Sequence, residues 1–309
     1  MAIYDYEGNV ISVGSSNFVN VKADYGAKGN GTTDDSTSIQ NALDSLSSTG
    51  GIIYFPVGTY KVSTPVSFYS NQTLWFENGA IIKAGTSGQS HIMGSKIDTT
   101  ITAYNGVHDV VIYGATFDGS AFNSNTLLFG TAHAKNILID SCSFINPFGL
   151  SHNIEINSSK NVRIKNCFFN RGANVGSDAE MIQLDRATTG VYVEDINTDG
   201  TNCMFIDIYE NTFVDNTASP AVGNHNGTPN FVNVHDNIFD NFTGTRGAID
   251  LSSTNLSIFN NTFNNCTIGV KSEGATHYIH DNRFVGVTTA ISGSASVAHA
   301  NMINGTYTA

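Results

Sequence analysis

The stretch Ile206-Asp207-Ile208-Tyr209-Glu210-Asn211-Thr212-Phe213 decides the fold, because its pattern returns along the second half of the chain. It recurs as Val232-Asn233-Val234-His235-Asp236-Asn237-Ile238-Phe239 and as Leu256-Ser257-Ile258-Phe259-Asn260-Asn261-Thr262-Phe263. A repeat of about 25 residues is typical of one coil of a solenoid. Each copy has alternating apolar residues, a polar turn and a Phe, and none has helical spacing. Each copy therefore predicts a short strand, a bend, and a second strand that starts near the Phe.

The Phe serves as the anchor of each copy, and the anchors predict about nine stacked coils. They are Phe117, Phe144, Phe169, Ile196, Phe213, Phe239, Phe263, Phe284 and Met302. A further strand precedes each copy, as in Ile154-Glu155-Ile156 and Ile182-Gln183-Leu184. No helix-period segment connects these strands, so the strands of successive coils must stack directly on one another. The sequence therefore predicts an all-β chain with the architecture of a single-stranded parallel β-helix.

An Asn stands two residues before the Phe anchor in the later coils, at Asn211, Asn237, Asn261 and Asn282. Asn tolerates the left-handed backbone that a tight bend requires, so we expect it at the bend, with its amide bonded to the Asn of the next coil. Cys142 and Cys167 occupy the same position in earlier coils. Coils about 4.8 Å apart do not exclude a disulfide, but two reduced thiols in one column are the favoured interpretation.

The charge balance limits the classes of partner. The chain has 14 basic and 26 acidic residues among 309, a net charge of −12. Such a chain repels nucleic acid and acidic membranes, so neither is expected as a partner. No apolar run reaches the length of a membrane span, and Met1 to Asn9 lacks the regions of a signal peptide. We expect either a chain made without a cleaved export signal or a sequence that does not include one.

The N-terminal third is organised differently from the repeats. We expect residues 1–18 to form a hairpin or extension around Glu7-Gly8-Asn9, and residues 19–309 to form the β-helix, with a cap at about 19–50. Acidic Asp34 and Asp35 precede apolar residues at helical spacing, and Gly50-Gly51 follows, which predicts a short amphipathic helix. Such a helix would cover the apolar core at the open end of the first coil.

Two segments of this region resemble a known superfamily. They are Val21-Lys22-Ala23-Asp24-Tyr25-Gly26-Ala27-Lys28-Gly29-Asn30-Gly31-Thr32-Thr33-Asp34-Asp35, followed by Ile39-Gln40, and Gly50-Gly51-Ile52-Ile53-Tyr54-Phe55-Pro56 with Gly58 and Tyr60. They resemble the opening of pectate-lyase-like β-helix proteins, which include polygalacturonase-type hydrolases, polysaccharide lyases and phage tailspike depolymerases. The resemblance is specific over residues 19 to 85 and implies a right-handed β-helix that acts on a carbohydrate.

The resemblance does not supply catalytic residues. Polygalacturonase-type hydrolases carry Asn-Thr-Asp, Asp-Asp, Gly-His-Gly and Arg-Ile-Lys in that order. Here Asn197-Thr198-Asp199 is not followed by Asp-Asp, and Arg163-Ile164-Lys165 lies upstream of it. His225 stands in Gly223-Asn224-His225-Asn226-Gly227 instead of Gly-His-Gly. That family's roles are therefore not transferred, and Asp199 is interpreted as a turn residue.

The alternation of side chains along the strands points to a candidate site. If Ile154, Ile156, Ile182 and Leu184 face the core, then Glu155, Gln183 and Asp185 face outward. Glu155 and Asp185 would lie one coil apart and two residues out of register, at roughly 5 to 9 Å. That range covers the carboxylate spacings of retaining and inverting glycosidases. We expect Glu155, Asp185 and Glu180 to be catalytic.

Other polar residues gather around these carboxylates and are predicted to bind substrate: His152, Asp178, Arg171, Arg186, Asp207, Tyr209 and Asp250. Lys271 continues the outward column beyond Asp250, and His225 and Arg246 lie in adjoining loops. Tyr192 and Tyr209 would flank an elongated groove. Asp195, Asp199, Asp207, Glu210 and Asp215 are oxygen ligands that leave Ca²⁺ as an option, although no cofactor is required. The alternative interpretation is that these are solvated residues on one face of a repeat protein.

Three functions remain open at this stage. Hydrolysis by paired carboxylates is slightly favoured, because carboxylates outnumber basic groups. A lyase would need His152, Arg171, Arg186 or Ca²⁺ to neutralise a uronate. The third alternative is a non-catalytic, carbohydrate-binding or structural β-helix of a phage tail or cell surface. A polysaccharide is the expected partner in each case, a homotrimer is an option, and the expected location is extracellular or in a phage tail.

Overall fold

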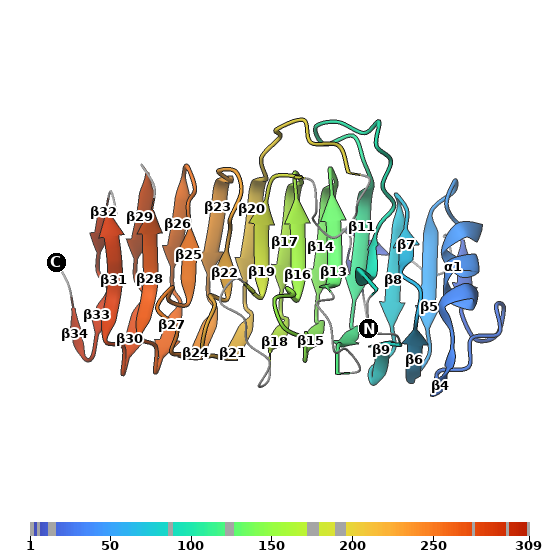
Figure 1. Ribbon diagram of the computed structural model, residues 1–309, viewed down its shortest axis with the longest axis horizontal. Coiled ribbons are helices and arrows are strands. Elements are labelled where there is room, and N and C mark those ends of the chain that lie inside the picture. The colour runs from blue at the N-terminus through green and yellow to red at the C-terminus, as the bar shows by residue number, and fades with distance from the viewer. Residues whose placement is uncertain are drawn as a thin grey trace.

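The computed structural model describes residues 3–4, 7–11, 17–85, 89–120, 127–171, 179–188, 196–273, 276–294 and 297–307. Over these residues the chain is a right-handed parallel β-helix, as the repeat and the resemblance predict. Figure 1 shows the coils side by side along the long axis, with α1 (Ser36–Ser45) at one end and the C-terminus at the other. Each complete coil contributes one strand to each of three sheets.

The described strands of the solenoid fall into sheets of nine, eleven and twelve strands. The nine-stranded sheet contains β7 (Val66–Phe68), β10 (His91–Ser95), β13 (Leu127–Ala132), β16 (Ile154–Asn157), β19 (Ile182–Asp185), β22 (Val222–Gly223), β25 (Ile249–Leu251), β28 (Ile268–Glu273) and β31 (Thr289–Ser294). The eleven-stranded sheet contains β3 (Phe18–Asn20), β5 (Gly51–Phe55), β8 (Gln72–Phe76), β11 (His108–Tyr113), β14 (Lys135–Asp140), β17 (Lys160–Lys165), β20 (Met204–Tyr209), β23 (Asn230–His235), β26 (Leu256–Phe259), β29 (His277–His280) and β32 (Val297–His299). The twelve-stranded sheet contains β4 (Asn30–Asp34), β6 (Gly58–Val62), β9 (Ala80–Ala84), β12 (Thr116–Asp118), β15 (Ser143–Ile145), β18 (Phe168–Asn170), β21 (Thr212–Asn216), β24 (Ile238–Phe242), β27 (Thr262–Asn264), β30 (Arg283–Val285), β33 (Met302–Ile303) and β34 (Thr306–Tyr307). Apart from them, β1 (Ile3–Tyr4) pairs antiparallel with β2 (Val10–Ile11).

A column of stacked phenylalanines forms the core. Successive rings from Phe117 to Phe284 lie 4.7 to 5.2 Å apart and nearly parallel. Phe169 pairs directly with Phe213, so the predicted anchor Ile196 is wrong. Ile196 instead lies on the long connection between β19 and β20, and it joins a small apolar cluster with Ala187 and with Leu127 and Ala132 of β13. The last anchor is also shifted, because Phe284 pairs with Ile303 and not with Met302.

The predicted amide ladder is present in the buried column of Asn211, Asn237, Asn261, Asn282 and Asn301. Each of the first four amides donates to the Asn Oδ1 of the next coil at 3.0 to 3.1 Å. The left-handed residue was predicted one position too late, since it is the residue before the ladder Asn, with φ of 54 to 55° at Glu210, Asp236, Asn260 and Asp281. The bend must come first so that the amide points inward, where it meets buried carbonyls. Cys142 and Cys167 are free thiols, as favoured from the sequence.

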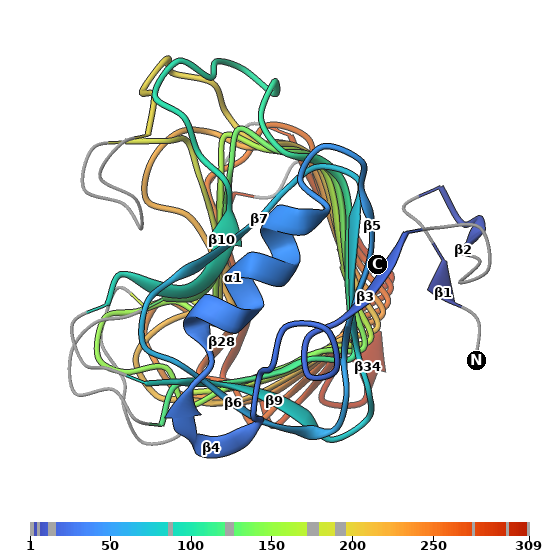
Figure 2. The ribbon, with the colours of Figure 1, turned by 90° about the vertical axis from the view of Figure 1, so that its right-hand side faces the viewer.

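The predicted capping helix is α1, whose buried Ile39, Ala42 and Leu43 pack on the first coil. Figure 2 shows α1 lying across the open end of the coil. Asp35, just before the helix, is 1% exposed and accepts the backbone N–H groups of Lys28 and Gly29 at 2.6 and 2.9 Å. Within the described ranges, no helix has the length and apolar character needed to cross a membrane.

Candidate functional site

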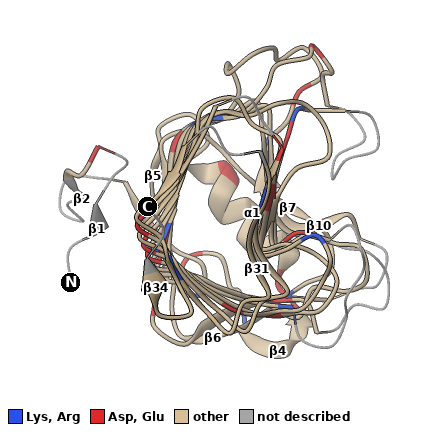
Figure 3. Cartoon of the chain, turned by 90° about the vertical axis from the view of Figure 1, so that its left-hand side faces the viewer, with Lys and Arg blue, Asp and Glu red and all other residues tan. Residues whose placement is uncertain are grey.

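The pairing of β16 with β19 positions the candidate carboxylates. Glu155 is opposite Gln183 and Asn157 is opposite Asp185, so Glu155 and Asp185 lie one coil apart and two residues out of register, as the alternation predicts. This diagonal corresponds to a backbone separation of about 8 Å. Both side chains lie on the outward face of the nine-stranded sheet, and they are only 4% and 1% exposed. In Figure 3, acidic and basic residues occur together on the side of the coil that carries β7, β10 and β31.

Glu155 is a buried carboxyl group whose pKa lies near neutrality. Its described hydrogen bond is with Asn157, whose Nδ2 donates to Oε1 at 3.1 Å. Burial raises the pKa of Glu155 to about 7, and the nearby Asp185 contributes in the same direction, while the Asn157 bond opposes it. A carboxyl group with a pKa of about 7 is partly protonated at neutral pH and can donate its proton.

Asp185 organises the loop that follows β22. Its Oδ1 accepts the backbone N–H groups of His225 and Asn226 at 2.8 and 3.0 Å. Its Oδ2 accepts Gln183 Nε2 at 3.0 Å and Asn226 Nδ2 at 3.3 Å. Burial raises the pKa of Asp185, while the bonds from Asn226 and His225 act in the opposite direction.

Glu180 is the ionised carboxylate of the group. It is fully buried and forms ion pairs with Arg246 Nη1 at 2.5 Å and His225 Nε2 at 2.9 Å, with His152 Nδ1 at 3.6 Å. Burial raises the pKa of Glu180, but its basic partners outweigh this effect and lower it to about 2. Gly223 makes room for this arrangement, because a Cβ there would lie 2.8 Å from Glu180 Cγ.

The two histidines of the cluster have pKa values displaced in opposite directions, although Glu180 acts to raise both. The hydrogen bond to Glu180 raises the pKa of His225. Burial lowers the pKa of His152 to about 4, against the attraction of Glu180. At neutral pH, His152 is therefore neutral and His225 has the stronger tendency to be charged.

Basic side chains form the solvent side of this face. His225, Arg246 and Lys271 are 29%, 22% and 32% exposed, whereas the carboxylates beneath them are buried. Arg246 Nε lies 2.8 Å from Asp250, and Lys271 Nζ lies 3.5 Å from the same carboxylate. The outward face therefore presents cations to solvent above a layer of carboxylates.

Arg171 and Arg186, which are predicted to bind substrate, differ in their exposure to solvent. Arg171 is fully buried and donates to the carbonyl groups of Ser151 and Gly149, and burial lowers its pKa to about 10. It supports the loop before β16 from within. Arg186 follows Asp185 and is exposed, whereas Asp178 and Tyr192 lie outside the described residues.

Asp207 and Tyr209 do not join the carboxylate cluster. Both are on β20 in the eleven-stranded sheet, on another face of the solenoid. Asp207 Oδ1 lies 3.0 Å from His235 Nε2, and the Tyr209 ring stacks on His235 at 5.1 Å. Ile206-Asp207-Ile208 is in the strand of a repeat copy and Ile154-Glu155-Ile156 is in the strand that precedes a copy, so their outward side chains lie on different faces.

The acidic residues considered for Ca²⁺ are dispersed. Asp199 accepts the backbone N–H groups of Ala103 and Thr201, whereas Asp207 is in the middle of β20. In the part of the chain that the structure describes, no three His, Cys, Asp or Glu side chains gather as a metal site. Asp195 lies outside that part.

Sequence reasoning did not identify Gly223 and Asn226 as parts of the site. Gly223 contributes by lacking a side chain, and Asn226 contributes mainly a backbone N–H. The sequence signal for this loop is the segment Gly223-Asn224-His225-Asn226-Gly227, in which a glycine stands at each end.

Comparisons with known proteins agree with this architecture. The family model described as rhamnogalacturonase A/epimerase, pectate lyase-like matches residues 18–292. The plasmin and fibronectin-binding protein A of Streptococcus pneumoniae is 28% identical over 262 residues, covering 72% of this chain and 36% of that protein. Alginate lyase 7 of Azotobacter vinelandii is 36% identical over 113 residues, covering 34% of this chain and 13% of that protein. The chain thus spans well under half the length of these curated relatives.

Solved structures have the same fold. The structure of PfbA, a surface adhesin of Streptococcus pneumoniae, matches with a TM-score of 0.72 and 22% identity, covering 92% of this chain and 76% of that one. A hyperthermoactive exopolygalacturonase from Thermotoga maritima matches with a TM-score of 0.67 and 17% identity, covering 92% and 79%. At these identities the likeness concerns the fold alone.

Proposed function

Since the chain belongs to the rhamnogalacturonase A/epimerase, pectate lyase-like family, we propose that it binds a polysaccharide outside the cell and cleaves its glycosidic bonds by hydrolysis. The proposed site is the outward face of β16, β19, β22 and β25. Relatives named as an alginate lyase and an exopolygalacturonase support a glycan as the substrate.

The observation that carries the proposal is that Glu155 and Asp185 lie on one face of neighbouring coils in different surroundings. Burial raises the pKa of Glu155 to about 7, whereas Asp185 accepts four hydrogen bonds, of which those from Asn226 and His225 act against the effect of burial on its pKa. Carboxyl groups in different surroundings can act as acid and base at the same pH. In the proposed reaction, Glu155 donates its proton to the glycosidic oxygen as the bond to the anomeric carbon breaks. Asp185 removes a proton from the attacking water.

The strand register places Glu155 and Asp185 on neighbouring coils of one face, with their Cα atoms about 8 Å apart. Carboxyl groups on such a diagonal can act on the same glycosidic bond, and the anomeric configuration of the first product would distinguish inversion from retention. Glu180 has the positioning role, because it holds His225 and Arg246 beside the site. Since Asp185 also binds the backbone of His225 and Asn226, the loop after β22 must open for substrate to reach it.

Conservative variants of the two carboxyl groups test this proposal. Purified protein is assayed for release of reducing ends from neutral glycans, polygalacturonate and alginate. Glu155→Gln and Asp185→Asn are each expected to lower kcat by at least about a hundredfold. Asp281→Asn is the matched control, because Asp281 is exposed in a left-handed bend that Asn also accepts. Full activity in both site variants would overturn the assignment, and an unsaturated product absorbing in the near ultraviolet would replace hydrolysis with elimination.

Non-catalytic glycan binding is the second candidate, and the burial of the carboxylates favours it. All four acceptor contacts of Asp185 are made within the protein, and one relative is named as an adhesin. In that case His225, Arg246 and Lys271 would bind an acidic glycan. Glu155→Gln would leave binding unchanged, whereas Arg246→Gln and Lys271→Gln would weaken it. Binding of polygalacturonate without any cleavage by the unmodified protein would favour this candidate.

A further inference from the structure

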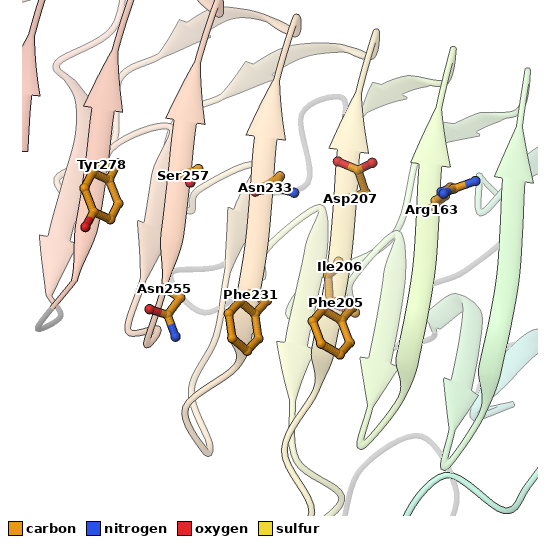
Figure 4. Close-up of a pocket in the computed structure, with 9 residues that line it drawn as sticks. All are labelled: Arg163, Phe205, Ile206, Asp207, Phe231, Asn233, Asn255, Ser257 and Tyr278. Atoms are coloured by element: carbon orange, nitrogen blue, oxygen red, sulfur yellow. The ribbon is translucent and has the colours of Figure 1, made fainter.

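A second polar and aromatic groove lies on the eleven-stranded sheet, away from the carboxylate cluster. It has a volume of about 350 Å³ and extends over β17, β20, β23, β26 and β29. Figure 4 shows its side chains in two rows that cross the strands. The upper row includes Arg163, Asp207, Asn233 and Tyr278, which the strand pairing aligns from coil to coil. The lower row includes Phe205 and Phe231.

The two phenylalanines are exposed and adjacent. Phe205 and Phe231 are 43% and 45% exposed, and their ring centroids are 4.9 Å apart at an interplanar angle of 16°. Each lies two residues before a member of the upper row, so both rows project from the same face. Exposed aromatic surface next to fixed polar groups is the composition of a ligand site and not of a solvated sheet face.

The backbone at these positions is unfavourable for phenylalanine. Phe205 and Phe231 have φ of 56° and 54°, in the left-handed region that bulky residues rarely adopt. The equivalent residues of other coils are Asp109, Asn136, Asn161 and Asn255, which suit this conformation. Asn161 also donates to Asn136 Oδ1 at 2.9 Å, a ladder contact that phenylalanine cannot continue. The fold alone would therefore favour Asn at both sites, and strain retained at exposed positions points to function.

We propose that this groove binds a neutral glycan chain that runs across the strands, along the long axis of the solenoid. The apolar faces of the sugar rings rest on Phe205 and Phe231, while hydroxyl groups bond to Asp207 and Asn233. Tyr278, which is 43% exposed, extends the aromatic surface at the far end. A neutral chain fits better than an acidic one, because Asp207 lies beside Arg163 in the upper row and offsets its charge, and the protein carries a net charge of −12. This groove is a binding surface and contains no part of the proposed hydrolytic site.

Substitution by Asn separates binding from stability. The probes are neutral cello-, xylo-, manno- and laminari-hexaoses, titrated by calorimetry into the full chain, with a galacturonate hexamer for comparison. Phe205→Asn and Phe231→Asn are each expected to weaken binding of the best neutral probe by about tenfold or more. Their thermal unfolding midpoint should be unchanged or higher, because Asn is the residue that the backbone favours here. Phe168→Asn is the matched control, since Phe168 is similarly exposed but lies on β18 of another sheet.

The possible outcomes are distinct. Binding that is lost in the two groove variants, kept in Phe168→Asn and kept in Glu155→Gln supports the proposal whatever the fate of the hydrolytic site. The proposal is overturned if no neutral hexaose binds at millimolar concentration or if the groove variants bind normally. It is also overturned if the unmodified chain self-associates in sedimentation and the groove variants are monomeric, because the groove would then be an interface between copies. A lower unfolding midpoint in both variants would make the phenylalanines structural.

Discussion

At the scale of single residues, the buried amide of Asn261 shows how the side chains of one coil stabilise the next. Its Nδ2 lies within hydrogen-bond distance of two carbonyl oxygens and Asn282 Oδ1, and its Oδ1 accepts two N–H groups of Asn237. Asn261→Ala should therefore lower the free energy of unfolding by about 2–4 kcal/mol, because several buried partners lose their bonds. Urea denaturation checks this, with Asn264→Ala on β27 of the same coil as the control. A loss no larger than that of the control would contradict a ladder that stabilises the fold.

Glu155 provides a second prediction at the residue scale, on activity. If Glu155 donates the proton, kcat/KM should decline above a pH of about 7, since its folded pKa is about 7 and the ionised form cannot donate. The measurement is the pH profile of reducing-end release. The alkaline limb should move when Asn157, which donates to Glu155 Oε1, is replaced in Asn157→Ala. Removing that bond raises the pKa of Glu155 further, so the limb should shift to higher pH. A limb that stays in place would argue against Glu155 as the acid.

The sequence could predict Glu155 and Asp185 as neighbours because alternation and coil spacing depend only on local pattern. It could not predict that Asp185 binds the backbone of His225 and Asn226, about 40 residues away, since nothing local specifies where the loop after β22 lies. The same limit explains the misplaced bend, where the choice between Glu210 and Asn211 depended on which side chain points inward. Phe205 and Phe231 stand where other coils have Asn. This difference points to a function only in combination with their left-handed backbone, which the sequence does not specify.

At the scale of elements, α1 closes the solenoid at its N-terminal end. Leu43 is fully buried against the first coil, and its carbonyl accepts Gln72 Nε2 at 2.7 Å. Leu43→Ala should lower the free energy of unfolding by about 3 kcal/mol, because it leaves a cavity between the helix and the coil. Hydrogen exchange should speed up first in β5 and β8. Asn41→Ala, on the exposed side of α1, is the control, and uniform exchange changes along the whole chain would contradict a capping role.

The helix and most strands were predictable because their patterns are complete within a few residues. The exception is the segment between β18 and β20, where Phe169 pairs with Phe213 across an interval of 44 residues. Counting at a constant period placed the anchor Ile196 there, although Ile196 belongs to no sheet. A connection that leaves the solenoid and returns keeps the strand pairing intact, so the repeat pattern on either side carries no sign of it.

At the scale of the whole molecule, the two faces of the solenoid have different chemistry. The nine-stranded sheet carries buried carboxylates under His225, Arg246 and Lys271, whereas the eleven-stranded sheet carries Phe205 and Phe231. A glycan bound on the eleven-stranded sheet would keep the protein near its substrate without occupying the carboxylate cluster on the nine-stranded sheet. The separation follows from the three-sheet cross-section, which gives each face its own column of outward positions.

On the face of the nine-stranded sheet, His152 and Glu155 should change the free energy of unfolding in opposite directions as the pH falls. Burial holds the pKa of His152 at about 4 against an ordinary 6.5, so the folded state is favoured above 6.5 and loses this stability as the pH falls toward 4. The pKa of Glu155 is raised from 4.5 to about 7, so its folded form gains stability as the pH falls from 7 to 4.5. Each displacement corresponds to about 3 kcal/mol, and the two contributions nearly cancel in the unmodified chain.

Removing either group should expose the contribution of the other. Glu155→Gln should lose stability between pH 7 and pH 4.5 by about 2–3 kcal/mol more than the unmodified protein, whereas His152→Gln should gain a similar amount over the same interval. Urea denaturation at a series of pH values gives both difference curves, in which groups common to the two proteins cancel. His299→Gln, at an exposed position on β32, controls for loss of a histidine. Difference curves with the same sign in both variants would mean that the pKa values of His152 and Glu155 are not displaced in opposite directions. The assignment of a raised pKa to Glu155 would then be wrong.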